Sequence, residues 1–220
     1  MKKIALALVL VAMTAGIATA QDNVKPVTFG VKAGFDMTHF WGKDCEHGMQ
    51  PNYQAGLFME YKVNDKFAIA PEVVFAAQGG KQDVDMKLDL SEWGLGMVDC
   101  EVTEKYNTNY VNVPVMLKFY PTSSFSIDFG PQVGFNVYSK CTSEYKVKGS
   151  ALPESFEEKQ TDDLKKGTQT VDVAAALGCT YNLSDNAFIQ ARYTLGLTKV
   201  FKGGDDIKNG NAQIAFGYRF

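Results

Sequence analysis

Residues 29–37 read Phe-Gly-Val-Lys-Ala-Gly-Phe-Asp-Met. Every odd-numbered position in this stretch is apolar, whereas the even-numbered positions hold glycine, lysine or aspartate. Successive side chains of a β-strand point to opposite faces, so this alternation predicts a strand with one apolar and one polar face.

The same period of two recurs along most of the chain that follows. Seven further segments alternate in this way, namely residues 53–61, 67–75, 111–119, 125–135, 171–181, 189–197 and 212–220. The sequence therefore predicts eight strands. Three prolines, Pro71, Pro114 and Pro131, fall within them. A closed barrel offers no free edge to proline, so we expect bulges or locally broken ladders there.

The connections alternate between short and long. Residues 63–66, 120–124 and 182–186 are short and polar, and the longer connections are about 39–52, 79–108, 139–168 and 199–210. Short periplasmic turns and longer external loops are typical of outer-membrane barrels. We therefore predict an all-β fold, an eight-stranded antiparallel up-and-down transmembrane β-barrel with long extracellular loops.

Two of the long connections have patterns of their own. Residues 83–90 still alternate, which predicts a hairpin that projects beyond the membrane. The acidic, lysine-rich run at 154–166 is interpreted as a solvated loop or a short helix rather than a binding site.

Alternation alone does not separate a membrane barrel from a soluble, lipocalin-like barrel, whose apolar face points inward. The aromatic residues favour the membrane. They lie on the apolar face, at the short-turn end of seven of the eight strands, as expected for rings at headgroup level. The predicted periplasmic-side girdle is Phe29, Tyr61, Phe67, Phe119, Phe125, Tyr181 and Phe220.

The polar face also favours the membrane barrel. In the strands it carries five basic and five acidic residues, and the apolar face carries none. Buried charges need partners, so a neutral polar face suits a filled interior, in which the frequent glycines leave room for long side chains. The predicted interior charge network is Lys32, Asp36, Glu60, Glu72, Lys118, Asp128, Asp172, Arg192 and Arg219. We interpret it as a plug; a narrow pore lining is the alternative.

The first twenty residues have the pattern of a secretory signal peptide. Met1-Lys2-Lys3 is basic, residues 4–17 are apolar, and Ala18-Thr19-Ala20 suits cleavage. The apolar run is shorter than the ~20 residues of a spanning helix, although a retained anchor is the alternative. We predict a signal peptide at 1–20, a barrel domain at 21–220, and location in a Gram-negative outer membrane. The net charge of −3 and the lack of a basic block argue against a nucleic-acid partner.

Three of the four cysteines, Cys45, Cys100 and Cys141, fall in the predicted outer loops, in an oxidising compartment. Cys100 and Cys141 flank adjacent strands at similar heights, which favours a disulfide between them. Pairing of Cys45 with either one remains open. Cys179 lies on the predicted lipid face and is interpreted as a small apolar residue.

The two histidines are His39 and His47. With Asp44, Cys45 and Glu46 nearby they could bind a metal, but the spacing of a metal site is absent, so no metal or cofactor is predicted. A lipid-modifying barrel enzyme would need a nucleophile or base beside a histidine near the outer rim. His39 is expected near the outer rim, but the sequence shows no nucleophile or base matched to it. We therefore predict that the protein is not an enzyme.

Taken together, these residues resemble the PorT-like "porin family" of outer-membrane barrels, related to the OmpA/OmpX type. The matching segments are GVKAGFDMT (30–38), PEVVFAAQGGK (71–81), NYVNVPVMLKFYP (109–121), DFGPQVGFNV (128–137), ARYTLGLTKV (191–200) and QIAFGYRF (213–220). The resemblance covers roughly residues 27–220 and implies a barrel while saying little about activity. Tyr218 and Phe220 also resemble the signal read by the outer-membrane assembly machinery; an ordinary aromatic last strand is the alternative.

The sequence therefore predicts a filled outer-membrane barrel that acts as a structural or surface interaction protein through its extracellular loops. Its expected partners are outer-membrane lipid and the assembly machinery, with an external ligand unspecified. A small pore or a secretion-associated transport accessory is the first alternative. A lipid-modifying enzyme is the second alternative, and a soluble binding barrel is the third.

Overall fold

The computed structural model describes residues 27–42, 48–90, 96–149, 156–203 and 206–220. Within these ranges the chain forms nine strands: β1 (Val27–Trp41), β2 (Gln50–Lys62), β3 (Phe67–Leu90), β4 (Gly96–Thr122), β5 (Phe125–Gly149), β6 (Phe156–Asp163), β7 (Val171–Asn182), β8 (Ala187–Gly196) and β9 (Lys208–Arg219). None of the described residues belongs to a helix long and apolar enough to cross a membrane. The predicted signal peptide lies outside the described residues.

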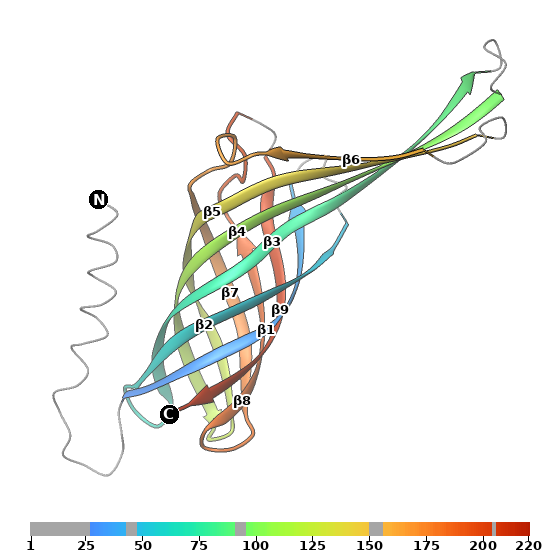
Figure 1. Cartoon of the computed structure of the whole chain (residues 1–220). Helices are drawn as coiled ribbons and strands as arrows, with labels where there is room; N and C mark the ends of the chain where they lie inside the picture. Colours follow the sequence, from blue (N-terminus) through green and yellow to red (C-terminus); the bar gives the residue numbers. More distant parts are fainter. Residues whose placement is uncertain (1–26, 43–47, 91–95, 150–155, 204–205) are drawn as a thin grey trace.

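Eight strands close a ring. They pair antiparallel in the order β1-β2-β3-β4-β5-β7-β8-β9, and β9 pairs back with β1. Figure 1 shows this ring as a tilted barrel with the short turns and the C-terminus at one end. Closure gives every strand two neighbours, as a sheet in hydrocarbon requires. The predicted all-β, up-and-down barrel is confirmed.

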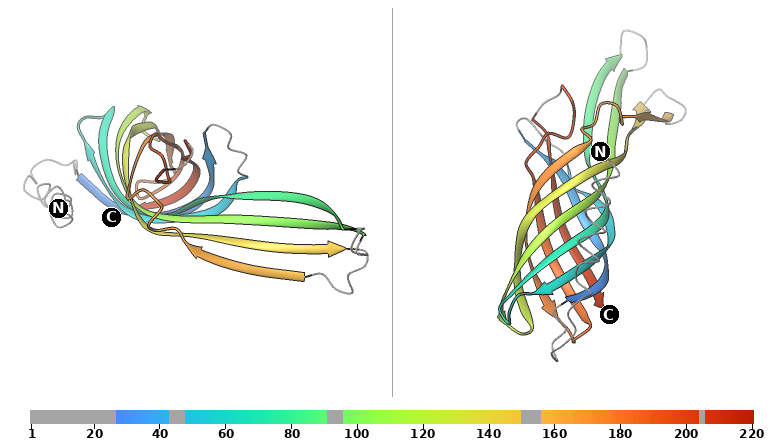
Figure 2. Two further views of the ribbon diagram at one scale, coloured as in Figure 1. Left: turned by 90° about the horizontal axis from the view of Figure 1, so that it is seen from above. Right: turned by 90° about the vertical axis from the view of Figure 1, so that its left-hand side faces the viewer.

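The barrel strands β3, β4 and β5 continue past the barrel and form, together with β6, a projecting four-stranded sheet, which we call the blade (residues 81–90, 96–107, 140–149 and 156–163). Its β3–β4 pairs run from Lys81↔Lys105 to Leu90↔Gly96, and its β5–β6 pairs run from Lys140↔Asp163 to Val147↔Phe156. The blade extends far to one side of the barrel mouth (Figures 1 and 2).

The hairpin predicted at 83–90 is confirmed, because β3 and β4 remain paired to its tip. The interpretation of 154–166 as a loop or short helix is wrong for residues 156–163, which form β6. This segment is almost entirely polar, so its own sequence does not reveal an apolar face. Pairing with β5 determines the strand instead. The described residues therefore form the eight predicted barrel strands and one further strand, β6, which belongs to the blade.

Burial in the barrel strands follows the predicted alternation. On β7, Asp172, Ala174 and Ala176 are buried, whereas Leu177 on the outer wall is 62% exposed. The apolar residues thus cover the outside of the barrel, and the polar ones fill the inside. This is the arrangement of a barrel surrounded by lipid and not of a soluble barrel.

The prolines interrupt the ladder locally. The β2–β3 pairing passes from Phe58↔Glu72 directly to Tyr61↔Ile69, skipping the position of Pro71. The β4–β5 pairing likewise passes from Pro114↔Gln132 to Leu117↔Phe129, skipping Pro131. The register is the same on both sides of each interruption, so the missing proline N–H removes ladder bonds without inserting a bulge.

The predicted disulfide between Cys100 and Cys141 is wrong. Both thiols are free, and Cys141 pairs with Tyr106, six residues along β4 from Cys100. Six residues of strand span roughly 20 Å, and a disulfide needs Cα atoms within about 7 Å. The error arose because β4 and β5 continue as paired strands where loops were expected. Cys45 lies outside the described residues.

Candidate functional site: barrel interior and blade

The barrel interior contains a buried ion-pair cluster centred on Glu72. Arg192 donates two hydrogen bonds to this carboxylate, at 2.9 and 2.7 Å, and Lys32 Nζ lies 2.6 Å from it. The three residues come from β3, β8 and β1 and are each at most 4% exposed. One carboxylate therefore joins three strands that are not all neighbours in the ring.

A second cluster lies nearer the short turns. Lys118 Nζ is 3.4 Å from Asp128 and 3.7 Å from Glu60, and Arg219 lies 3.6 Å from Glu60. The Tyr120 hydroxyl donates to Glu60 at 2.7 Å. Tyr120 was placed in a turn by the sequence interpretation, yet it lies two residues after Lys118 and so shares its face, which was the available signal.

The remaining two predicted interior residues, Asp36 and Asp172, are also buried. Asn211 donates to Asp36 at 3.3 Å, whereas Thr198 and Asn209 donate to Asp172 at 2.7 and 3.4 Å. All nine predicted network residues are buried, and seven of them gather in the two ion-pair clusters. Neither Asp36 nor Asp172 has an ion-pair partner among the described residues.

Two inward phenylalanines also fill the interior and were not foreseen. Phe58 and Phe188 are 4% and 3% exposed, and their rings meet edge to face with centroids 5.3 Å apart. Gly30 and Gly217 are their cross-strand partners. A Cβ at these glycines would lie 2.3 Å from the Phe58 ring and 2.0 Å from the Phe188 ring. These two glycines therefore make room for aromatic rings rather than for charged side chains.

Replacing Gly217 by valine is expected to destabilise the barrel by about 1–3 kcal/mol, the usual cost of overpacking. The added methyl groups must displace the Phe188 ring, which also contacts Arg219 at 4.6 Å. Urea unfolding in lipid bilayers measures the change. Gly167→Ala is a control for an added methyl group, because its Cβ would meet only an ordinary van der Waals contact, with the Leu164 carbonyl oxygen at 3.6 Å. Equal stability of Gly217→Val and the native protein would contradict the packing argument.

The predicted girdle residues lie at the short-turn end of the outer wall. The register pairs Phe67 with Phe119 and Phe125 with Tyr181, and the Phe67 and Phe119 rings are 5.3 Å apart. Phe220 is 69% exposed, and its backbone N–H donates to Phe29 at 2.9 Å. Aromatic rings thus line this end on several adjacent strands.

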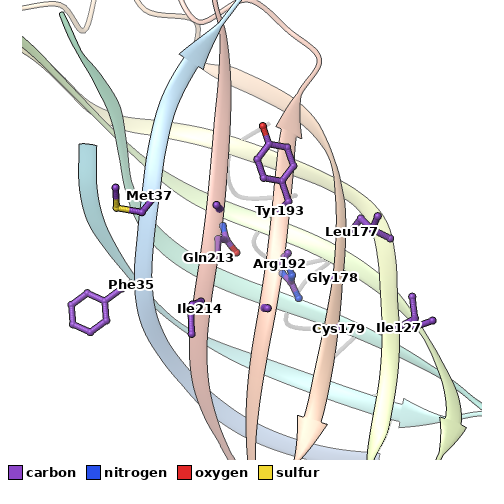
Figure 3. A pocket seen from close by; sticks show the side chains of 12 residues that line it. Phe35, Met37, Ile127, Leu177, Gly178, Cys179, Arg192, Tyr193, Gln213 and Ile214 are labelled. Atoms are coloured by element: carbon purple, nitrogen blue, oxygen red, sulfur yellow. The ribbon is translucent and has the colours of Figure 1, made fainter. Parts of the chain in front are cut away.

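The outer wall also carries a shallow apolar groove of about 630 Å³. Phe35, Met37, Leu177 and Tyr193 stand around it, as Figure 3 shows. The small residues Ala191 and Ala212 also line it. Because the groove is on the lipid-facing side of the strands, an acyl chain of the surrounding membrane is its natural contact.

His39 lies at the outer rim. Its Nε2 atom is 3.4 Å from the Tyr193 hydroxyl. His47, Cys45, Asp44 and Glu46 lie outside the described residues. Among the residues that are described, no three His, Cys, Asp or Glu side chains gather as metal ligands.

The two faces of the blade differ in charge. Its outward face, which continues the lipid-facing wall of the barrel, carries the ion pairs Lys81–Asp83, Lys105–Glu144, Lys146–Glu157 and Lys159–Glu144, with N–O distances of 2.7, 3.4, 3.2 and 3.1 Å. Hydrogen bonds from Lys159 and then Lys105 lower the pKa of the Glu144 carboxyl. This face is therefore charged and internally paired.

The opposite, inward face continues the lumen side of the barrel and is largely apolar. The β3–β4 register has no shift along its length, so Gln82, Val84 and Met86 follow the buried Ala76 and Gln78 on one face. Polarity therefore inverts near Gly79: below it the lipid side is apolar, and above it the lumen side is apolar. The inversion marks the outer limit of the membrane.

Aromatic rings connect the blade to the barrel mouth. The rings of Phe40, Tyr106 and Phe201 contact one another in edge-to-face or tilted arrangements, with each pair of centroids 5.9 Å apart. Burial, followed by the hydrogen bond to Glu104, raises the pKa of the Tyr106 phenol, which keeps this hydroxyl a donor. The base of the blade is thus packed against the mouth.

Comparison with known proteins places this geometry among outer-membrane barrels. Residues 19–202 match the family model described as outer membrane protein beta-barrel domain. Ail, the attachment invasion locus protein of Yersinia pestis, is a similar solved structure at 14% identity, covering 88% of this chain and 98% of Ail, with a TM-score of 0.41. Neisserial surface protein A is similar at 12% identity, covering 87% and 97%, with a TM-score of 0.44. No curated protein matches the sequence.

Proposed function

Because the chain belongs to the outer membrane protein β-barrel domain family of Gram-negative outer membranes, we propose that it is a surface interaction protein. The barrel anchors the chain in the lipid, and the blade presents a binding surface outside. The term PorT-like, for the finer family, is part of this proposal and rests on segments such as 109–121 and 128–137.

The observation that carries the proposal is the blade. β3, β4 and β5 have 24, 27 and 25 residues, whereas about 9–11 tilted residues cross a bilayer. More than half of each long strand is therefore not needed for anchoring. A hydrogen-bonded four-stranded sheet outside the membrane is rigid enough to hold a partner in a defined orientation.

A small pore finds less support. Phe58, Phe188 and the Glu72 cluster occupy the interior, and an eight-stranded barrel has little more room than its own side chains fill. A lipid-modifying enzyme would need a catalytic partner for His39, whose Nε2 atom lies 3.4 Å from the Tyr193 hydroxyl.

Export and assembly complete the proposal. The basic and apolar pattern of residues 1–20 supports cleavage by the secretory pathway. Tyr218 and Phe220 are 47% and 69% exposed on the outer wall, with their rings 6.1 Å apart. This aromatic pair is accessible for recognition of β9 by the assembly machinery before the membrane covers it.

Shortening the blade tests the function. In the variant, an Asn-Gly turn replaces residues 84–102 and another replaces 144–159, joining Asp83 to Thr103 and Ser143 to Gln160 at positions already paired in the sheet. We expect at least tenfold lower retention of whole cells on a serum-protein-coated surface, with equal surface display and heat-modifiable gel migration. Equal retention at equal display would contradict the proposal.

A further inference from the structure

We propose that the inward face of the blade binds a cationic, amphipathic polypeptide segment. The inference rests on the proposed surface interaction function and names the kind of partner. Among the described side chains, this face consists of Gln82, Val84, Met86, Cys100, Val102, Glu104, Tyr106, Cys141, Ser143, Tyr145, Glu158, Gln160 and Asp162.

The apolar part of the face is continuous across strands. The register aligns Val84, Val102 and Tyr145 in one row, which ends at Glu158 on β6. Met86 and Cys100 are aligned in a neighbouring row. Val84, Met86 and Tyr145 are 37%, 47% and 38% exposed although they lie outside the membrane. A contiguous apolar patch in water is typical of a binding surface.

The charged residues of the inward face indicate the charge that a partner should carry. Three carboxylates, Glu104, Glu158 and Asp162, are on the inward face, and no described residue of that face is basic. The described lysines of the blade are all on the outward face: Lys81, Lys87, Lys105, Lys140, Lys146 and Lys159. The acidic groups of the outward face have lysines beside them, whereas every charged residue among the described side chains of the inward face is acidic. Charge complementarity therefore favours a basic partner.

Two other occupants of this face, a second copy of the chain and the membrane, are disfavoured. A second copy packed face to face would bring like carboxylates together, which costs association energy. The membrane is excluded by position, because the inward face continues the lumen side, whereas lipid contacts the opposite side. In Figure 2 the blade projects sideways from the barrel, so a partner can approach this face from outside.

The spacing of the acidic residues specifies the partner further. Glu158 and Asp162 lie on one side of β6, four residues apart and thus roughly 13 Å from each other. On a helix, basic residues seven or eight positions apart lie on the same side and are roughly 11–12 Å apart at ~1.5 Å per residue, close to that distance. Apolar residues on the side of that helix that faces β5 would cover Tyr145 and extend toward Val102.

A peptide-binding experiment tests the inference on the full chain in zwitterionic phosphatidylcholine nanodiscs, which remove lipid charge as a cause of binding. The probe is a fluorescent 18-residue leucine–lysine amphipathic peptide, measured by anisotropy. Glu158→Gln with Asp162→Asn is compared with Glu157→Gln and Asp163→Asn, which remove the same charge from the outward face of the same strand. We expect at least tenfold weaker binding for the first pair and less than a twofold change for the second.

Further variants and a control peptide distinguish the possible explanations of binding. Val84→Thr with Val102→Thr should also weaken binding at least fivefold, and a leucine–glutamate peptide of the same pattern should not bind. Equal losses for the two charge pairs, or undiminished binding to the blade-shortened variant, would overturn the inference. A dimer in sedimentation that Val84→Thr with Val102→Thr dissolves would replace it with self-association. If cell retention needs the blade but the inward-face variants bind normally, the proposed function stands and this inference fails.

Discussion

Replacing Glu72 by glutamine is expected to destabilise the barrel by about 3–5 kcal/mol, the cost of removing one partner from a buried ion-pair cluster. Glu72 is the sole carboxylate within 4 Å of Lys32 and Arg192 among the described residues. Glutamine has nearly the same volume, so the expected change comes from charge. Two cations that are each at most 4% exposed would then face each other without an anion between them.

The measurement is the free energy of unfolding from urea titration in lipid bilayers. Glu157→Gln is the matched control, because its Lys146 partner is 44% exposed and a solvated pair contributes little. The triple replacement of Lys32, Glu72 and Arg192 by methionine should recover most of the lost stability, since no buried charge remains. A loss below about 1 kcal/mol for Glu72→Gln would show that the cluster is hydrated and not a dry plug.

Leu177→Arg is expected to destabilise the protein by about 2–4 kcal/mol, the cost of an arginine on the lipid face near the middle of the bilayer. Leu177 is 62% exposed on the outer wall, about midway along β7, and has no water around it when lipid covers the barrel. The guanidinium would have to reach the interface or draw water into the hydrocarbon.

Met86→Arg is the control for this variant. Met86 is also an exposed apolar residue, at 47%, but it lies on the blade beyond the polarity inversion. We expect no loss of stability for Met86→Arg in the same bilayer assay. Similar effects at both positions would place the membrane boundary elsewhere along β3.

The comparison of the two exposed residues shows why alternation predicts strands more reliably than it predicts surroundings. Both stretches of β3 continue the period of two, but the large apolar residues are mostly odd-numbered in 67–75 and even-numbered in 83–86, so they point to opposite sides of one continuous strand. The sequence pattern reveals the inversion only after the register shows that no residue is inserted between the two stretches. Similarly, the sequence positions of Cys100 and Cys141 do not show how far each lies from the barrel. The pairing of β4 with β5 determines that distance.

By itself the sequence determined the barrel strands, their apolar and polar faces, the short turns and the identity of the charges inside, because a period of two is a local property of the chain. Only the tertiary structure decided which charges pair, that Gly30 and Gly217 accommodate phenylalanine rings, and that the polar segment 156–163 is a strand. These features depend on register between distant strands. A one-residue shift would leave each strand's own pattern intact while changing all of its partners.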